Sequence, residues 1–127
     1  MIPKFRAWSK KFKRMYEVTL IDYENGDVGL KDDHGGVAIG DIKQLILMQS
    51  TGMFDKNGVE IWEGDIVLTT RLIDYTYKNF KGVVKMLEGC WLIDTGTDAV
   101  YLWSEIEENE VIGNIYQNSE LLESVDK

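Results

Sequence analysis

Apolar and polar side chains alternate over several short stretches of the chain, and glycine-containing turns separate these stretches. Within the apolar-rich stretch 15–21, Tyr16, Val18 and Leu20 alternate with Glu17 and Thr19, which is typical of a strand with one buried face. The alternation places Leu20 on the buried face. Asn25-Gly26 follows, and both residues tolerate the positive φ that a type I′ turn requires. The pattern therefore predicts a hairpin whose second strand covers residues 27–31.

Further short strands are expected along the rest of the chain. A second Asn-Gly pair, Asn57-Gly58, predicts a turn between apolar flanks. Gly113 lies inside the last apolar stretch and is expected to mark a β-bulge or a point of close approach to another part of the chain. The expected strands cover residues 43–49, 66–70, 82–86, 91–93, 100–103 and 111–116.

Helix is expected only in two short segments, one acidic turn at 104–109 capped by Ser104 and a terminal turn at 119–124 capped by Asn118. The expected fold is mainly β, built from small antiparallel strands and hairpins, with the C-terminal half forming a small SH3-like barrel. We expect a single domain over 1–127, with a seam near Thr51-Gly52. This seam would separate an N-terminal hairpin region, 1–51, from a barrel-like region, 52–127.

Composition narrows the class of protein. The chain has 127 residues, of which 44% are hydrophobic and 28% charged, the mix of a globular domain with one core. Its single cysteine, Cys90, excludes an intramolecular disulfide and is expected to be a small buried apolar residue. The longest apolar run, 99–103, is too short to span a membrane, and the N-terminus lacks the apolar stretch of a secretion signal.

Charge is distributed unevenly along the chain. The formal net charge is −8, yet residues 1–16 hold six basic residues and no acidic one, which leaves −14 for the remainder. A chain of this net charge repels nucleic acid at long range, although a local basic segment can still contact phosphate. The alternative is that the segment packs on the acidic body of the protein or stays solvated.

Aromatic residues are interleaved with the basic ones in this N-terminal segment, where Phe5 and Trp8 lie between lysine and arginine residues. Rings that stack on bases and cations that contact phosphates form the binding platform of single-stranded nucleic-acid binders. A strand anchored in the core by its aromatic residues is the alternative interpretation. The candidate residues for binding a partner or nucleic acid are Lys4, Arg6, Trp8, Lys10, Lys11, Lys13 and Arg14.

Catalytic and metal-binding patterns are scarce. The chain has one histidine, His34, which follows Asp32 and Asp33 in a predicted turn and could ligate a metal only with further ligands. Gly35-Gly36 lacks the spacing and the lysine of a phosphate-binding loop. We therefore expect no metal, no cofactor and no enzymatic activity.

Several longer motifs together resemble the YopX family, small proteins encoded by phages and prophages of bacteria, chiefly Gram-positive ones. The resemblance implies a mainly β fold, a phage origin and an intracellular setting, and it supplies no catalytic residues because the family has no established biochemical activity. Ser119 stands where the family usually has proline. The motifs that carry the resemblance are Lys4-Phe5-Arg6-Ala7-Trp8, Leu47-Met48-Gln49-Ser50-Thr51-Gly52, Asp55-Lys56-Asn57-Gly58-Val59-Glu60-Ile61-Trp62-Glu63-Gly64-Asp65-Ile66-Val67 and Glu110-Val111-Ile112-Gly113-Asn114-Ile115-Tyr116, running into Asn118-Ser119-Glu120-Leu121-Leu122.

These observations favour a non-enzymatic phage accessory protein that binds a host or phage protein in the cytoplasm of the bacterial host. The alternative is a nucleic-acid binder that uses the basic N-terminal segment. A third hypothesis is an enzyme, or a DNA mimic that presents a row of carboxylates including Glu105, Glu107, Glu108 and Glu110. The opposite charges of the two parts of the chain also favour a homo-oligomer, in which the basic segment of one copy meets the acidic face of another.

Overall fold

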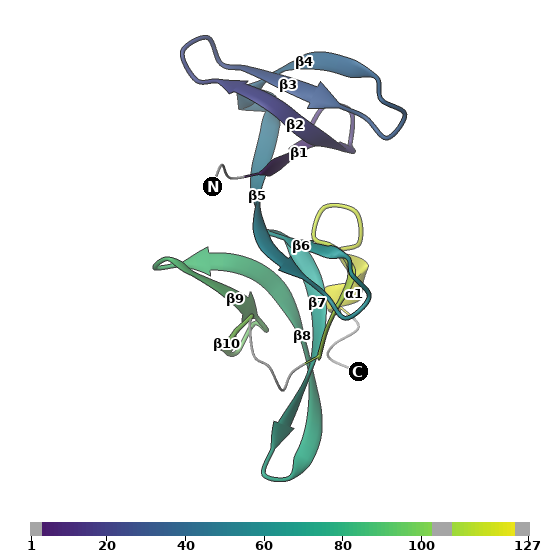
Figure 1. Cartoon of the computed structure of the whole chain (residues 1–127), viewed down its shortest axis with the longest axis vertical. Coiled ribbons are helices and arrows are strands. Elements are labelled where there is room, and N and C mark those ends of the chain that lie inside the picture. Colours follow the sequence, from purple (N-terminus) through teal and green to yellow (C-terminus); the bar gives the residue numbers. More distant parts are fainter. Residues whose placement is uncertain (1–3, 103–107, 124–127) are drawn as a thin grey trace. The chain divides into compact units, whose positions relative to one another are not determined.

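The computed structural model describes residues 4–102 and 108–123, and these residues form a mainly β protein (Figure 1). The chain divides into two compact units, Met1–Ser50 and Thr51–Lys127. Trp103, Ser104, Glu105 and Glu107 lie outside the described residues, and so does most of the acidic turn expected at 104–109.

The first unit is an antiparallel sheet with the strand order β4-β3-β2-β1-β5. A 3₁₀ helix, η1, joins β4 to β5, and β5 continues into the second unit, where β6 pairs with it. The elements are β1 (Phe5–Ser9), β2 (Arg14–Asp22), β3 (Asp27–Lys31), β4 (Val37–Asp41), η1 (Ile42–Gln44), β5 (Leu45–Phe54) and β6 (Glu60–Trp62).

The predicted hairpin is confirmed as β2 and β3, but its connection is not the expected type I′ turn. Asp22 and Asp27 are paired, so four residues form the loop, and of Asn25 and Gly26 only Gly26 has positive φ, at 74°. The Asp22 carboxylate accepts the backbone N–H groups of Glu24 and Asn25, and this side-chain contact favours the longer loop.

A β-bulge in β2 corrects the expected position of Leu20. The register with β3 shifts between Val18 and Leu20, so the two residues lie on opposite faces of the sheet. Val18 and Ile21 pack against the core of the first unit, whereas Leu20 is exposed. The fully or nearly buried residues of this core are Ala7, Val28, Leu30 and Leu45.

The second unit contains a five-stranded antiparallel sheet in the order β10-β9-β8-β7-β11. Its core is formed by Ile61, Val67, Val84, Ile93 and Leu102. The bulge expected at Gly113 is confirmed by a register shift between Val111 and Gly113. The elements are β7 (Asp65–Ile73), β8 (Thr76–Leu87), β9 (Cys90–Asp94), β10 (Ala99–Tyr101), β11 (Glu108–Asn114) and a short helix α1 (Glu120–Glu123).

The described strands of this second sheet do not close into the barrel expected for the C-terminal half. Closure would need β10 and β11, the two edge strands, to pair with each other, and β10 has only three residues, which pair with β9. Cys90 is exposed rather than buried, because it is the first residue after the turn between β8 and β9.

The long central motif of the sequence is structural. Asp55 accepts the N–H groups of Asn57 at 2.9 Å and Val59 at 2.8 Å on one carboxylate oxygen, and that of Val111 at 2.9 Å on the other. Burial alone would raise the pKa of Asp55, but these three hydrogen bonds outweigh it and hold the pKa below its usual value. A second buried carboxylate, Asp65, accepts the N–H of Trp62.

Asp55→Ala should lower the free energy of unfolding by about 3 kcal/mol at pH 7, because three N–H groups lose a charged acceptor. The pKa of Asp55 is lower in the folded chain than the ~3.9 of an unfolded aspartate. Its contribution is therefore complete above about pH 5 and is lost as pH falls through the folded pKa. Urea denaturation should show a smaller difference between variant and wild type at acidic pH.

The control for this prediction is Asp33→Ala, because Asp33 is exposed. It should change the free energy of unfolding by less than about 0.5 kcal/mol. Equal destabilisation by the two substitutions would contradict the role assigned to Asp55.

Candidate functional site

The basic N-terminal segment is part of a folded hairpin rather than an extended arm. β1 pairs with β2 on one side and with β5 on the other. The loop that follows β1 is also fixed, since Lys10 donates its backbone N–H to Gln44 O at 3.0 Å and its Nζ to Lys43 O at 3.3 Å. Of the candidate residues, Lys4 precedes β1, Arg6 and Trp8 lie on β1, and Lys10, Lys11, Lys13 and Arg14 follow it.

The two aromatic residues nearest the lysines differ in burial. Trp8 is only 8% exposed and belongs to the core, so its ring does not face solvent. Phe12 is 64% exposed, and Lys11 Nζ lies 5.3 Å from the centre of its ring. Trp8 was a predicted binding residue and Phe12 was not, although Phe12 stands between Lys11 and Lys13.

We call residues 10–14 the basic loop. Its conformation is held by Ser9, whose Oγ accepts the N–H of Phe12 and whose backbone carbonyl accepts the N–H of Lys13. Lys13 has a positive φ of 57°, which completes the turn into β2. The loop therefore presents one aromatic ring together with the side chains of Lys10, Lys11, Lys13 and Arg14.

A second exposed feature is the hairpin formed by the far ends of β7 and β8, residues 71–79, which we call the projecting hairpin (Figure 1). Among the residues that the structure describes, β11 pairs with β7 as far as Thr70, and β9 pairs with β8 from Val83 onwards. Its tip is a two-residue turn in which Asp74 and Tyr75 both have positive φ, at 51° and 64°.

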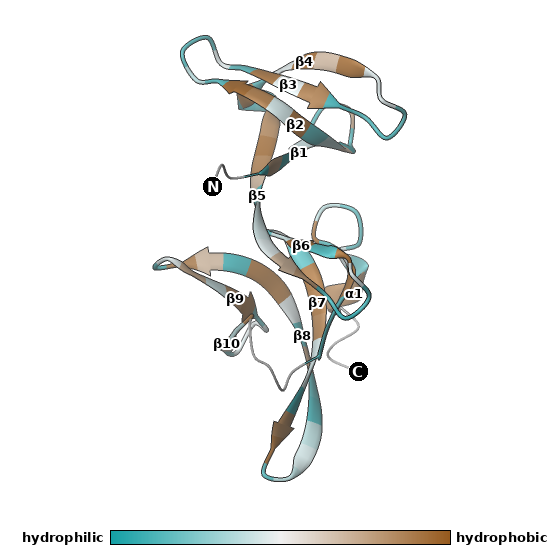
Figure 2. Cartoon of the chain, in the orientation of Figure 1, coloured by the Kyte–Doolittle hydropathy of each residue, from teal (hydrophilic) through white to brown (hydrophobic). Residues whose placement is uncertain are grey.

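Large apolar side chains are exposed along the projecting hairpin. Tyr75 at the tip is 99% exposed, and Leu72 and Tyr77 form an exposed cross-strand pair. Figure 2 shows the end of β7 in brown, next to the tip of the hairpin. The strands predicted at 66–70 and 82–86 left this hairpin out. Asp-Tyr is not a typical turn pair, so the sequence carries no clear signal for it.

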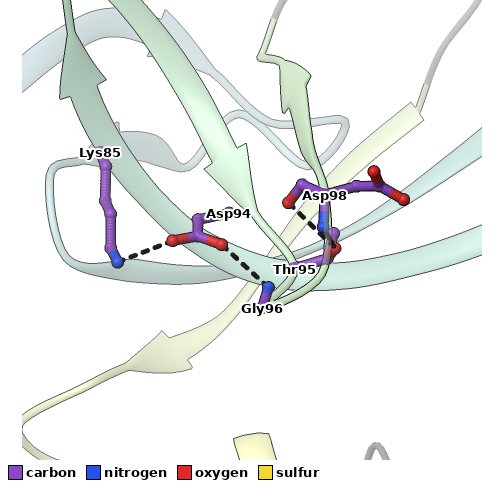
Figure 3. A network of polar contacts seen from close by, with 5 residues as sticks. All are labelled: Lys85, Asp94, Thr95, Gly96 and Asp98. Atoms are coloured by element: carbon purple, nitrogen blue, oxygen red, sulfur yellow. Dashed lines mark hydrogen bonds and ion pairs between the residues drawn. The ribbon is translucent and has the colours of Figure 1, made fainter.

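A pocket of about 440 Å³ lies on the second unit beside the turn between β9 and β10. Lys85 Nζ lies 2.8 Å from Asp94 Oδ2, and Asp94 Oδ1 accepts the N–H of Gly96 at 2.8 Å (Figure 3). The ion pair with Lys85, followed by the Gly96 hydrogen bond, lowers the pKa of Asp94. These contacts hold the turn between β9 and β10 in its conformation.

The metal site and the carboxylate row were the other candidates from the sequence. No group of three or more potential metal ligands is found among the residues that the structure describes, and Asp32 accepts the N–H groups of His34 and Gly36 instead. Glu108 and Glu110, two members of the expected carboxylate row, lie on β11. None of the helices described is long and apolar enough to cross a membrane.

Comparisons with known proteins give a consistent result. Residues 4–123 match the model of the family described as YopX protein. The solved structure of protein EF1440 from Enterococcus faecalis is 30% identical with a TM-score of 0.59, covering 96% of this chain and 99% of that chain. Protein yopX from Bacillus subtilis is 26% identical with a TM-score of 0.65, covering 93% and 96%. None of the curated proteins compared with the chain matches it.

Trp8→Ala should destabilise the protein by about 4 kcal/mol, because it empties a core position. Phe12→Ala should change the free energy of unfolding by less than about 0.5 kcal/mol, because the ring is exposed. Thermal or urea denaturation measures both values. Comparable losses in the two variants would show that the ring of Phe12 packs on the protein.

Proposed function

The chain belongs to the YopX protein family, and we propose that it is a phage-encoded accessory protein, a non-enzymatic protein-binding module in the cytoplasm of the infected bacterium. The family resemblance supports the phage origin and the intracellular setting. The observation that supports a binding role is the projecting hairpin, which exposes Leu72, Tyr75 and Tyr77 to solvent.

Two-stranded hairpins are marginally stable in water unless another surface packs on them. Leu72, Ile73, Tyr75 and Tyr77 are all exposed within six consecutive positions, which is a dense apolar surface for a segment outside the core. Tyrosine is enriched at protein interfaces because its ring buries a large area and its hydroxyl still finds a polar partner. The hairpin is therefore suited to insert Tyr75 into an apolar pocket of a host or phage protein.

Combined replacement of Tyr75 and Tyr77 by alanine should reduce recovery of the protein partner at least tenfold, since two interface anchors are lost. The measurement is an affinity pull-down from phage-infected cells after nuclease treatment, with bound proteins quantified by mass spectrometry. The matched control is Tyr23→Ala, because Tyr23 is also a highly exposed tyrosine but lies in the first unit. Undiminished capture by the double variant would contradict the proposal.

The second candidate function is binding of single-stranded nucleic acid through the basic loop. It is favoured by the exposed ring of Phe12, which stands among Lys10, Lys11, Lys13 and Arg14. A stacking ring surrounded by cations is the arrangement that single-stranded nucleic-acid binders use. The buried Trp8 takes no part in this version of the hypothesis.

Replacement of Lys10, Lys11 and Lys13 by glutamine should abolish an electrophoretic shift with a single-stranded oligonucleotide if the basic loop binds phosphates. Wild-type affinity should fall with salt, with a logarithmic slope of about −3 for four neutralised phosphates. A variant with Lys31, Lys56 and Lys78 replaced by glutamine has the same net charge and should bind as wild type does. An equal loss of oligonucleotide binding in both triple variants would show that binding depends on net charge and not on the basic loop.

A further inference from the structure

β4 is the outermost strand of the first unit, and one side of its backbone faces no strand among the described residues. Hydrogen bonds at both ends of the β3–β4 ladder identify the backbone N–H and C=O groups of β4 that point away from β3. Asp32 N–H donates to Gly36 O at 2.9 Å, and Ile42 N–H donates to Gly26 O at 2.8 Å. Because hydrogen-bonded and non-hydrogen-bonded pairs alternate in an antiparallel ladder, Val37, Ile39 and Asp41 direct their backbone groups away from β3.

The side chains of this edge are apolar and exposed. Val37 is 78% exposed and Ile39 is 70% exposed, and Figure 2 shows β4 largely in brown. The register places Leu20, Gly29 and Ile39 in one row across β2, β3 and β4, so exposed Leu20 belongs to the same face. Natural edge strands are normally protected by lysine, proline or a bulge. β4 has none of these.

We propose that β4 pairs in antiparallel fashion with β4 of a second copy of this chain, around a two-fold axis that passes through Ile39. This register places Ile39 opposite Ile39, Ala38 opposite Gly40, and Val37 opposite Asp41. The outward backbone groups of Val37, Ile39 and Asp41 then meet the same groups of the second copy, and two six-stranded sheets become continuous.

The charges of the sheet favour a second copy in this orientation. Asp22, Asp27 and Asp41 form a row at one end of the outer face. At the other end Lys31 lies between Glu17 and Val37, so these three residues together carry no net charge. Antiparallel pairing brings the Lys31 end of one sheet beside the acidic end of the other. A pairing that aligned the two acidic rows on one face would be disfavoured by like-charge repulsion.

This contact differs from the expected homo-oligomer, in which the basic segment would meet an acidic face. It is isologous, so it closes after two copies, whereas a head-to-tail contact can continue into rings or filaments. It uses neither the projecting hairpin nor the basic loop, so it stands independently of the proposed function.

Sedimentation equilibrium of the full chain should give a mass of about 29 kDa, twice the 14.6 kDa of one chain. Ile39→Lys should return the mass to 14.6 kDa with an unchanged circular dichroism spectrum. Leu87→Lys places the same charge at an exposed apolar position of β8 and should leave the dimer intact. A wild-type chain that remains at 14.6 kDa up to millimolar concentration would overturn the proposal.

Cysteine crosslinking tests the register, in a Cys90→Ser background because Cys90 is exposed. Ile39→Cys should form an intermolecular disulfide on mild oxidation, because paired Cα atoms on the axis lie about 5.5 Å apart. Val37→Cys should not crosslink, because its two copies are offset by four residues, about 14 Å. Crosslinking of Val37→Cys instead of Ile39→Cys would overturn this register.

The edge of β4 could also bind a peptide of another sequence, and the same measurements distinguish this from pairing of two copies. Binding of a peptide of another sequence by monomeric wild-type protein, abolished by Ile39→Lys, would assign the edge to that peptide. This outcome would overturn the pairing of two copies while leaving the tyrosine variants of the projecting hairpin as a separate test.

Discussion

Three backbone N–H groups from two distant parts of the chain meet on the carboxylate of Asp55. Two of them close the turn before β6, and the third belongs to Val111 on β11, which holds one edge of the second sheet. A single charge therefore joins a local turn to a contact between residues 56 positions apart in sequence. Much of the long central motif follows from the need to bury and satisfy this group.

The fold was predictable wherever a strand has one buried face. The β2–β3 hairpin, the bulge at Gly113 and the mainly β class follow from alternation and turn residues. The loop at Asn25 was not predictable from residue preferences, because it depends on which N–H groups the Asp22 carboxylate accepts. β4 gives no alternating pattern at all, because its apolar residues are exposed.

The basic loop, the projecting hairpin and the edge strand β4 were less predictable from the sequence than the fold was. Sequence analysis assigns a large apolar residue to the core unless something contradicts it. Alternation placed Leu20 on the buried face, whereas the structure exposes it. Phe12 and Ile39, for which no prediction was made, are exposed as well. Conversely, Trp8 lies among cations in the sequence but is buried, because β1 is a central strand between β2 and β5. The pairing of the strands, which the sequence does not reveal, determines which of these side chains are buried and which are exposed.

At the tip of the projecting hairpin, Tyr75 adopts a backbone conformation that glycine would adopt at a lower free-energy cost. A left-handed backbone conformation disfavours a residue with a Cβ atom by about 1 kcal/mol relative to glycine, and Tyr75 adopts it at full exposure. Glycine at this position would make the turn more stable and would remove the ring. The turn is therefore less stable than one with glycine would be, and it holds an aromatic ring in water.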